Sequence, residues 1–416
     1  MSRRESVDAL RKKVDQVDEK IVELLNERAS LAQKIGRTKS LGKEEVFVPS
    51  REKEIFQRIS TLNRGPLPEP AVHSIYHEIL SASRSLEAPI KVAYLGPEAT
   101  FTHMAARERF GSSTTFVPLP SIADVFQEVG QGRAGYGVVP IENSTEGVVT
   151  HTLDMLVEAD AKICAEIYLE IHHYLLSRSG KREEIRRIVS HPQALAQCRR
   201  WLTSNLPKIP VDEVASTAHA AQLAAADPNL AAVASSLAKE LYGLEAVEEN
   251  VEDLTNNITR FLVIGDQTTK PSGDDKTSLV FSVKDEVGIL HRMLDPFAKN
   301  RINLTKIESR PLKHKPWEYL FFLDLKGHVE EPRIQRAIKK LERDCLFIKI
   351  MGSYPCAVCV SSSECPSISA PWFPMSRVSP SKRWSGNMES RIRSSSLPTR
   401  TRWDLPPRRS RRWRRG

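Results

Sequence analysis

Residues 10–39, LRKKVDQVDEKIVELLNERASLAQKIGRTK, decide the fold of the N-terminal part of the chain. Apolar residues recur every three or four positions from residue 7 to residue 35, which predicts one long helix packed against other helices. Arg28 interrupts this apolar stripe, and a cation on a packed face needs an anionic partner to offset its desolvation. Lys39 follows about three turns later, so both cations share one face if the helix persists.

Arg11 lies on the same predicted helix but cannot share a small ligand with Arg28. The two residues are roughly 25 Å apart along the helix axis and about 100° apart around it. If Arg11 also binds the ligand, it must reach a site that is built mainly by another copy of the chain. The spacing therefore predicts an interlocked homodimer or a higher homo-oligomer.

Two shorter helices are expected to complete this region, with further polar groups on their inner faces. Ser50 is a plausible N-cap for a helix from Arg51 to about Leu62, and after the proline-rich turn at 66–70 a third helix runs to Glu87. One inward charge is explained by a core ion pair, but several on three helices favour a binding site. The inward polar residues are Arg28, Lys39, Arg51, Glu52, Ser83 and Glu87.

The string quoted above, with PSREKEIF at 49–56 and SASRSLE at 81–87, closely resembles the all-helical chorismate mutases over about residues 5–88. The resemblance implies a Claisen rearrangement of chorismate to prephenate. That reaction needs no nucleophile or metal, only a fixed substrate conformer and stabilisation of charge at the ether oxygen. Lys39 and Glu87 are implied to act at that oxygen as catalytic residues. The implied substrate-binding residues are Arg28, Arg51, Glu52 and Ser83, with Arg11 supplied by the partner subunit.

Glu87 stands where the best-studied chorismate mutases have a glutamine. A carboxyl group donates a hydrogen bond only when it is protonated. We therefore expect mutase activity to fall with rising pH as Glu87 ionises.

After residue 89 the pattern changes from helical to alternating strands and helices, which predicts an α/β domain over residues 90–266. Polar clusters stand at the ends of its apolar runs, as expected for a ligand that binds outside the strand termini. Helix capping also explains such clusters, because Ser190-His-Pro-Gln193 is an ordinary helix start. The apolar runs are 91–95, 134–139, 188–190, 231–234 and 261–264, and the polar clusters are 96–103, 140–147, 190–193 and 256–261.

The strings YLGPEATFTHMAA, GVVPIENSTEGVV, IVSHPQALAQC and NNITRFLVIG look like prephenate dehydratase over about residues 90–266. The resemblance implies two lobes like those of periplasmic binding proteins, with prephenate in the cleft. Prephenate would lose CO2 and hydroxide there to give phenylpyruvate. Thr259 is the implied catalytic residue, and we interpret its hydroxyl as a positioned donor or relay because it is a poor acid. The implied substrate-binding residues are Glu142, Asn143, Ser190, Gln197 and Arg260.

The elements expected after residue 276 run strand, helix, strand, strand, helix, strand, which predicts a ferredoxin-like unit over residues 277–355. With KIESRP at 306–311, this unit resembles an ACT regulatory domain. The resemblance implies L-phenylalanine as effector, bound at an interface between two such domains. The implied effector-binding residues are Gly288, Glu308, Ser309 and Arg310.

The net charge of +9 comes from the end of the chain. Residues 356–416 hold 13 Lys and Arg against 3 Asp and Glu, which leaves 48 against 49 for residues 1–355. This tail is rich in Ser, Pro and Arg without periodicity, so we predict that it is disordered. Binding of nucleic acid by its arginines and tryptophans, or an origin in a shifted reading frame, stays open, and the first is disfavoured because no nucleic-acid-binding motif accompanies them.

No apolar stretch reaches the length that spans a bilayer, and the N-terminus has no signal-peptide pattern. Scattered cysteines indicate reduced thiols, and a lone CxxC motif is a weak metal signal. The sequence therefore predicts a cytoplasmic protein without cofactor or metal, bound to neither membrane nor nucleic acid.

The whole chain is thus expected to hold an all-α mutase (1–88), an α/β two-lobed dehydratase (90–266), an α+β ACT domain (277–355) and a tail (356–416). A phenylalanine-responsive binding protein with inactive catalytic halves is the alternative, as is a chain with one active half. The presence of Arg28, Lys39, Glu52 and Thr259 together favours the enzyme, because a binding protein would not need them all.

Overall fold

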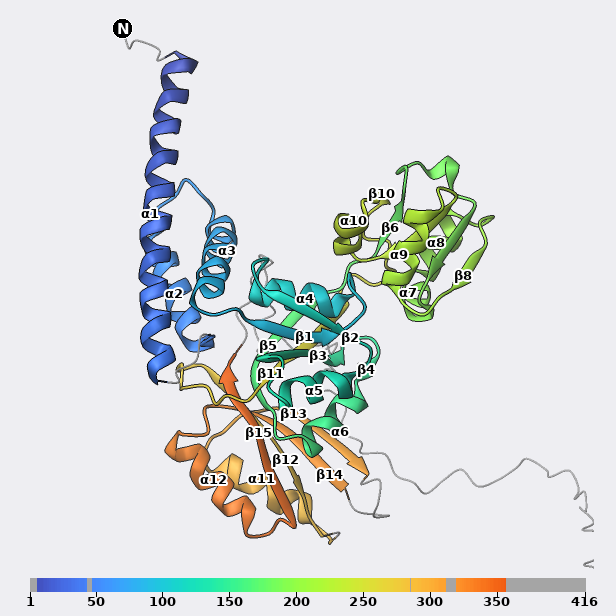
Figure 1. Cartoon of the computed structure of the whole chain (residues 1–416). Helices are drawn as coiled ribbons and strands as arrows, with labels where there is room; N and C mark the ends of the chain where they lie inside the picture. The colour runs from blue at the N-terminus through green and yellow to red at the C-terminus, as the bar shows by residue number, and fades with distance from the viewer. Residues whose placement is uncertain (1–5, 43–46, 285, 312–318, 357–416) are drawn as a thin grey trace, which may run out of the picture. The chain divides into compact units, whose positions relative to one another are not determined.

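The computed structural model describes residues 6–42, 47–284, 286–311 and 319–356 (Figure 1). Within these ranges the chain forms a helical region, a two-lobed α/β region and a four-stranded α+β region. The predicted tail from residue 357 onward lies outside the described residues.

The N-terminal region is helical, and the prediction of one long first helix is confirmed. The second helix begins at Pro49 and not at Arg51, so Ser50 is not its N-cap as predicted. Proline is favourable in the first turn because its missing N–H has no partner there in any residue. The helices are α1 (Val7–Gly42), α2 (Pro49–Leu62) and α3 (Glu69–Glu87).

The apolar stripe of α1 lies largely in solvent when a single chain is considered. Val14, Ile21 and Leu24 expose 58%, 47% and 62% of their surface. The sequence predicts a packed stripe, and one copy of the chain leaves it uncovered. Such a long apolar face marks an interaction site.

The first lobe of the α/β region is a mixed sheet in the order β2-β1-β3-β11-β5, with the short β4 paired to β3. Its first three strands in sequence are parallel, and β11 lies antiparallel between β3 and β5. The elements are β1 (Lys91–Leu95), α4 (Phe101–Phe110), β2 (Thr115–Leu119), α5 (Ile122–Gly130), β3 (Tyr136–Asn143), β4 (Gly147–Val148), α6 (Thr150–Glu158), β5 (Lys162–Glu170) and β11 (Ile258–Gly265).

The second lobe is a sheet in the order β10-β6-β9-β7-β8, packed on small helices rich in alanine. Its elements are β6 (Tyr174–Ser177), the short turn η1 (Arg182–Glu184), β7 (Arg187–Ser190), α7 (Pro192–Gln197), α8 (Arg199–Asn205), β8 (Val211–Glu213), α9 (Thr217–Ala226), β9 (Leu230–Ala234), α10 (Ser236–Tyr242) and β10 (Glu245–Glu248).

The chain crosses between the two lobes at residues 171–173 and 249–257. The two crossovers are bonded to each other. The backbone N–H of Val251 donates to the carbonyl of His173 at 2.9 Å, and that of Ile171 donates to the carbonyl of Asn257 at 2.7 Å. The lobes are therefore joined by a paired connection.

The last region is an antiparallel sheet in the order β13-β14-β12-β15, with α11 and α12 on one face (Figure 1). The other face of the sheet packs on the first lobe, where Phe322 and Met351 share a core with Leu156 and Leu262. The predicted ferredoxin-like order is confirmed. The elements are β12 (Asp275–Ser282), α11 (Ile289–Lys299), β13 (Leu304–Pro311), β14 (Tyr319–Lys326), α12 (Pro332–Glu342) and β15 (Phe347–Pro355).

Candidate active sites

The first candidate site lies between α1 and α3. Arg28 of α1 donates to the hydroxyl of Ser83, and Lys39 lies with its Nζ 3.5 Å from the Glu87 carboxylate. Gly36 permits this close approach, because a Cβ there would lie 2.9 Å from the Cα of Glu87. Two cations and two acceptor groups thus converge at the crossing of two helices.

Glu87 is placed unusually for a carboxylate. Its Oε2 atom is buried and, among the described residues, accepts no hydrogen bond, although it forms the ion pair with Lys39. A buried acceptor without a hydrogen bond is rare in folded proteins and needs an explanation. The ion pair with Lys39 offsets part of the cost of burying this oxygen.

The remaining residues predicted for this site lie elsewhere in a single chain. Arg11 is exposed and pairs with Asp8, and Arg51 is exposed and pairs with Glu54. Neither is joined to Arg28 or Lys39 by any bond among the described residues. Arg11 therefore contacts only Asp8 among the described side chains for which a bond is found, and it lies far from the Arg28–Lys39 cluster of its own chain.

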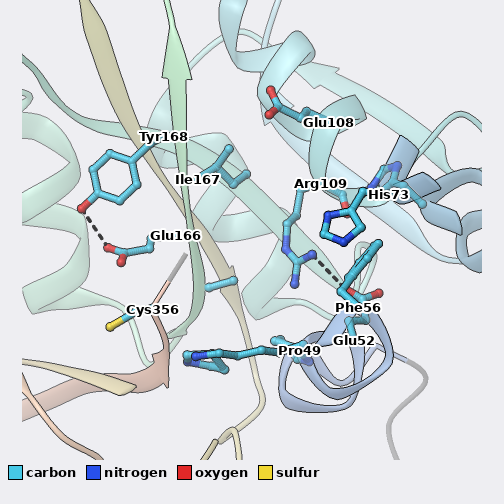
Figure 2. Close-up of a pocket in the computed structure, with 14 residues that line it drawn as sticks. Pro49, Glu52, Phe56, His73, Glu108, Arg109, Glu166, Ile167, Tyr168 and Cys356 are labelled. Carbon is cyan, nitrogen blue, oxygen red and sulfur yellow. Dashed lines mark hydrogen bonds and ion pairs between the residues drawn. The ribbon is translucent and has the colours of Figure 1, made fainter. Parts of the chain in front are cut away.

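Glu52 is buried, but it does not face the Arg28–Lys39 cluster as the sequence predicts. Its carboxylate accepts from Arg84 of α3 and, at 2.7 Å, from Arg109 of α4 (Figure 2). The ring of Phe47 lies beneath Arg109, whose Cζ is 4.8 Å from the ring centroid. Two arginines offset one buried carboxylate, so Glu52 joins the helical region to the first lobe here.

The second candidate site is a cleft of about 380 Å³ between the two lobes of the α/β region. Thr259 at the start of β11 lies in it with Asn143 from the end of β3, because these two residues are paired in register. Gln197, from the end of α7, lines the cleft from the second lobe. Thr100, Phe101, Thr102, Glu146, His173, His191, Gln193, Ser216, Thr217 and Phe261 also line it.

Asn143 determines which atom of Thr259 is available to a ligand. Its Oδ1 accepts from the backbone N–H groups of Thr145 and Glu146, so its Nδ2 must point the other way and donates to Thr259 Oγ1 at 2.7 Å. Among the described residues, the Thr259 hydroxyl donates to no acceptor. Its hydrogen is therefore free to point into the cleft.

Two further polar residues are bonded to the cleft residues: His173, which lines the cleft, and Asn257, which lies behind it. Asn257 Nδ2 donates to Gln197 Oε1 at 3.0 Å, and its Oδ1 accepts from Asn143 Nδ2 at 2.8 Å. His173 Nε2 lies 2.8 Å from the same Gln197 oxygen. Asn257 stands within the quoted NNITRFLVIG string, two residues before Thr259, and His173 stands beside a second histidine in an apolar run.

Ser190 lies outside the cleft lining, contrary to the sequence prediction. Its side chain is fully buried, and the hydroxyl donates to the carbonyl of Val233 at 2.5 Å. It ties β7 to β9 and leaves the helix start after it to His191, whose side chain accepts from Gln193 N–H. Helix capping, the alternative explanation for this cluster, thus applies to His191 but not to Ser190.

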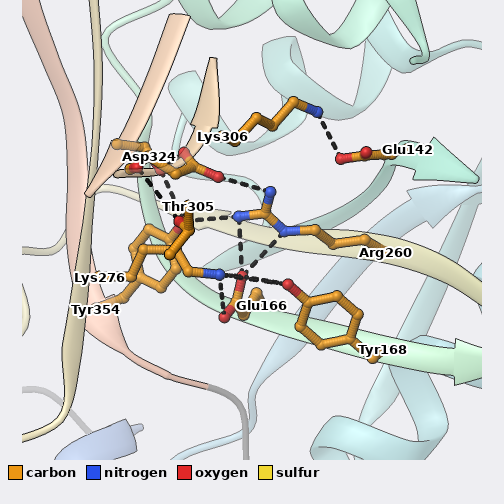
Figure 3. A network of polar contacts seen from close by, with 10 residues as sticks. Glu142, Glu166, Tyr168, Arg260, Lys276, Thr305, Lys306, Asp324 and Tyr354 are labelled. Atoms are coloured by element: carbon orange, nitrogen blue, oxygen red, sulfur yellow. Dashed lines mark hydrogen bonds and ion pairs between the residues drawn. The ribbon is translucent and has the colours of Figure 1, made fainter. Parts of the chain in front are cut away.

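Arg260 and Glu142 also differ from prediction, because they point away from the cleft. Successive side chains on a strand alternate between faces, so Arg260 lies opposite Thr259 and Glu142 lies opposite Asn143. Glu142 accepts from Lys306 of β13 at 2.5 Å. Arg260 donates to Glu166 of β5 at 3.0 Å, and at 2.7 Å to Asp324 of β14 (Figure 3).

Four buried charges form a network directly behind Thr259. The first lobe supplies Arg260 and Glu166, while the α+β region supplies Lys276 and Asp324. Burial acts against ionisation of Asp324, but Arg260 and Lys276 prevail and lower the pKa of its carboxyl group. Likewise burial opposes the charge of Arg260, while Asp324 and Glu166 raise its pKa. Asp324 and Arg260 are therefore charged near neutral pH, in a network of two basic and two acidic side chains.

The residues predicted to bind an effector are distributed over the α+β region. Gly288 precedes α11 with φ of 77°, a left-handed conformation suited to glycine. Glu308, Ser309 and Arg310 lie on the edge strand β13. Arg310 donates to Asp154 and to the carbonyl of Thr150 on α6, so this end of the strand is tied to the first lobe.

Two features are absent from the described ranges. No cluster of three or more His, Cys, Asp or Glu side chains there could hold a metal ion. In the same residues, every helix is too short or too polar to cross a membrane.

Family models match three successive parts of the chain. The model described as chorismate mutase type II matches residues 10–88, that of prephenate dehydratase matches 92–269, and that of the ACT domain matches 277–343. A curated relative from Aquifex aeolicus (strain VF5), named a bifunctional chorismate mutase/prephenate dehydratase, is 52% identical over 358 residues. The alignment covers 85% of this chain and 99% of the relative.

Two solved structures resemble the α/β and α+β regions. A prephenate dehydratase from Arthrobacter aurescens, in complex with L-Phe, has a TM-score of 0.59 and 33% identity, covering 64% of this chain and 90% of that one. A structure described as GqqA, a novel type of quorum quenching acylase, has the same TM-score and 32% identity, covering 64% of this chain and 98% of that one.

Proposed function

The chain belongs to the bifunctional chorismate mutase/prephenate dehydratase family, and we propose that it makes phenylpyruvate from chorismate in two steps, with prephenate between them. The observation that carries this proposal is the pairing of Thr259 with Asn143 in the interlobe cleft. The mutase step is supported by the Arg28–Ser83 and Lys39–Glu87 contacts between α1 and α3. We propose that α1–α3 carry the first reaction, the two lobes the second, and the ACT domain their regulation.

We propose that the mutase acts by electrostatics and positioning. Chorismate carries two carboxylates, and Arg28 and Arg11 are the cations proposed to bind them. Lys39 would donate to the ether oxygen, where negative charge develops as the C–O bond breaks, and Glu87 is proposed to lie at the same oxygen. Ser83, Arg51 and Glu52 remain proposed substrate contacts, and Glu52 would have to exchange its ion pairs with Arg84 and Arg109 to become one.

We propose that Thr259 eases the departure of hydroxide from prephenate. Because Asn143 donates to Thr259 Oγ1, the threonine hydrogen is directed to the cleft, where it can hydrogen-bond the leaving oxygen. Loss of CO2 provides the electron pair that expels hydroxide, and the ring becomes aromatic. Gln197 is proposed to bind a substrate oxygen from the second lobe. Glu142, Ser190 and Arg260 would then act by supporting the strands of the cleft and not by touching substrate.

We propose a homodimer in which α1 of each chain completes the mutase site of the other. This would bury the exposed apolar stripe of α1 and bring Arg11 to the partner's Arg28–Lys39 cluster. A cytoplasmic location is proposed with it, because Cys198 is a buried thiol that forms no disulfide, as in reducing compartments.

We propose that L-phenylalanine inhibits the dehydratase through the ACT domain, near Gly288 and Glu308–Arg310. The proposal is supported by ion pairs between the two domains. Asp324 of the ACT sheet pairs with Arg260, and Lys276 of the same sheet pairs with Glu166. Arg260 directly follows Thr259 in the chain. A shift of the ACT sheet on binding effector would therefore act on β11.

Thr259→Ala should lower dehydratase turnover about 100-fold or more, the loss typical of one positioned donor in a transition state. Thr259→Ser should keep most activity because it keeps the hydroxyl. Turnover of prephenate and of chorismate by the same purified protein measures this, with mutase activity as the internal control. Dehydratase activity that survives in Thr259→Ala would refute the role of the hydroxyl.

Glu87→Gln should keep mutase activity, because the glutamine amide can donate a hydrogen bond to the ether oxygen, whereas Glu87→Ala should lower it about 100-fold by removing the group. Rates of chorismate consumption measure this, with Glu23→Gln on the exposed face of α1 as the matched control. Full mutase activity of Glu87→Ala would contradict the proposal.

Chains carrying Arg11→Ala and chains carrying Arg28→Ala should each lose mutase activity, and co-expression of the two should restore about a quarter of it. The reason is that half of randomly mixed dimers are mixed, and each mixed dimer has one intact site. Dehydratase activity serves as the control for amount and folding. Absence of recovery, or full activity of Arg11→Ala alone, would show that Arg11 does not act across the dimer.

Asp324→Asn should weaken inhibition by L-phenylalanine while leaving its binding largely intact, because the variant breaks the ion pair between the ACT sheet and Arg260. Calorimetry measures the binding, and prephenate turnover with increasing L-phenylalanine measures the inhibition. Asp344→Asn, an exposed change just after α12 of the same domain, is the control. Equal inhibition of all three proteins would exclude this route of coupling.

A further inference from the structure

Two buried polar residues lie in the paired crossovers between the lobes and have no role in the reaction as proposed so far. His173 is 1% exposed in the first crossover, and Asn257 is 2% exposed in the second. Buried polar side chains are costly unless they are hydrogen-bonded, so their bonding shows what they hold in place.

The orientation of every amide around them follows from two backbone donors. The N–H groups of Thr145 and Glu146 donate to Asn143 at 2.9 and 3.0 Å, and a backbone N–H can only donate. The accepting atom is therefore Oδ1, and Asn143 presents its Nδ2 to Asn257. Asn257 must then accept with Oδ1, which leaves its Nδ2 to donate to Gln197.

The same logic fixes Gln197 and the tautomer of His173. Gln197 accepts from Asn257 Nδ2, so the contacting atom is the carbonyl oxygen, Oε1. His173 Nε2 lies 2.8 Å from that oxygen and so must carry the hydrogen. His173 Nδ1 is then the unprotonated nitrogen, consistent with its being buried without a hydrogen-bond partner among the described residues.

Gln197 consequently points its amide NH2 group (Nε2) toward the cleft. Its contacts there, with Thr145 Oγ1 and Glu146 Oε1, are both 3.4 Å, which is long for a hydrogen bond. If the Gln197 amide were turned over, its NH2 group would face two other N–H donors, His173 Nε2 and Asn257 Nδ2. None of these three donors would then have an acceptor. The NH2 group of Gln197 thus has a fixed orientation and can still donate to an oxygen of a bound anion.

We propose that His173 and Asn257 are positioning residues for the dehydratase reaction. They hold the amide NH2 group of Gln197 toward a carboxylate or carbonyl oxygen of the substrate. Asn257 also links Gln197 of the second lobe to Asn143 and Thr259 of the first, so the two halves of the site are set together. This inference rests on the proposed dehydratase function of the cleft.

The surroundings of His173 favour the neutral ring that this role requires. Burial lowers the pKa of His173, although the bond to Gln197 and the charge of Glu252 act in the opposite direction. Its ring also packs edge-on against Phe101 at a centroid distance of 5.3 Å, and its backbone N–H donates to Glu252 at 2.9 Å. Both contacts hold the ring independently of the bond to Gln197.

The test removes the donor and keeps the shape. His173→Phe should lower kcat/KM for prephenate about tenfold, the loss expected when one orienting hydrogen bond is removed. His173→Gln should restore most of it, since glutamine places an N–H donor at similar reach. His219→Phe, the same change on an exposed face of α9, is the matched control, and mutase activity of each protein reports folding of the chain.

A double-mutant cycle decides whether His173 acts through Gln197. In a Gln197→Ala background His173→Phe should have no further effect, because the group that it orients is gone. Asn257→Asp provides a second route: it keeps the acceptor for Asn143, loses the donor to Gln197, and should show the same tenfold loss and the same non-additivity.

The outcomes separate the two proposals. If the unmodified protein does not turn over prephenate, the proposed dehydratase function fails. If it does, and His173→Phe is fully active or costs the same factor with and without Gln197, the positioning role is wrong. A loss in His173→Phe that His173→Gln does not repair would likewise overturn it.

Discussion

The alternation of side chains along β11 is the constraint on which both the cleft and its control depend. Thr259 faces the interlobe cleft, and its neighbour Arg260 faces the ACT sheet. The strand is held from both sides, since Thr259 pairs with Asn143 on β3 and with Leu169 on β5. A slip of one residue would exchange the two faces, placing a guanidinium in the cleft and a hydroxyl among buried carboxylates.

The four-charge network extends this constraint across the domain boundary. Each domain contributes one cation and one anion: Arg260 and Glu166 also pair within the first lobe, whereas the ion pairs of Asp324 and Lys276 cross the domain boundary. Buried ion pairs add little to stability compared with apolar packing, but they penalise wrong arrangements strongly. Close packing of Gly352 against the backbone of Ile163 works in the same sense, because no larger residue fits there.

The helical region follows a different design. Its charged cluster needs only two helices, which one chain supplies, but the apolar stripe of α1 has no cover within that chain. Association would bury that stripe and extend the cluster in the same step. The ion pairs of Glu52 with Arg84 and Arg109 meanwhile fasten α2 and α3 to the first lobe. The two activities therefore share a mechanical connection even though their sites are separate.

Local patterns in the sequence were enough to determine the order of elements. The apolar period of α1, the strand–helix alternation after residue 89 and the final ferredoxin-like order each depend on neighbours in the chain, and the structure has all three. The strings that hold Asn143, Gln197 and Thr259 likewise predicted which segments meet at the cleft. Asn143 and Thr259 meet there because they are paired in register on β3 and β11, and Gln197 reaches them from the end of α7 in the second lobe.

Only the tertiary structure decided which face each polar side chain takes. The sequence assigned Arg260, Glu142 and Ser190 to the cleft with their neighbours, but two of them face the ACT domain and the third bonds Val233. It also passed over His173 and Asn257, whose partners are distant in the chain. The face that a strand residue takes depends on what covers each side of the sheet. That cover comes from segments far away in sequence, so no local pattern can specify it.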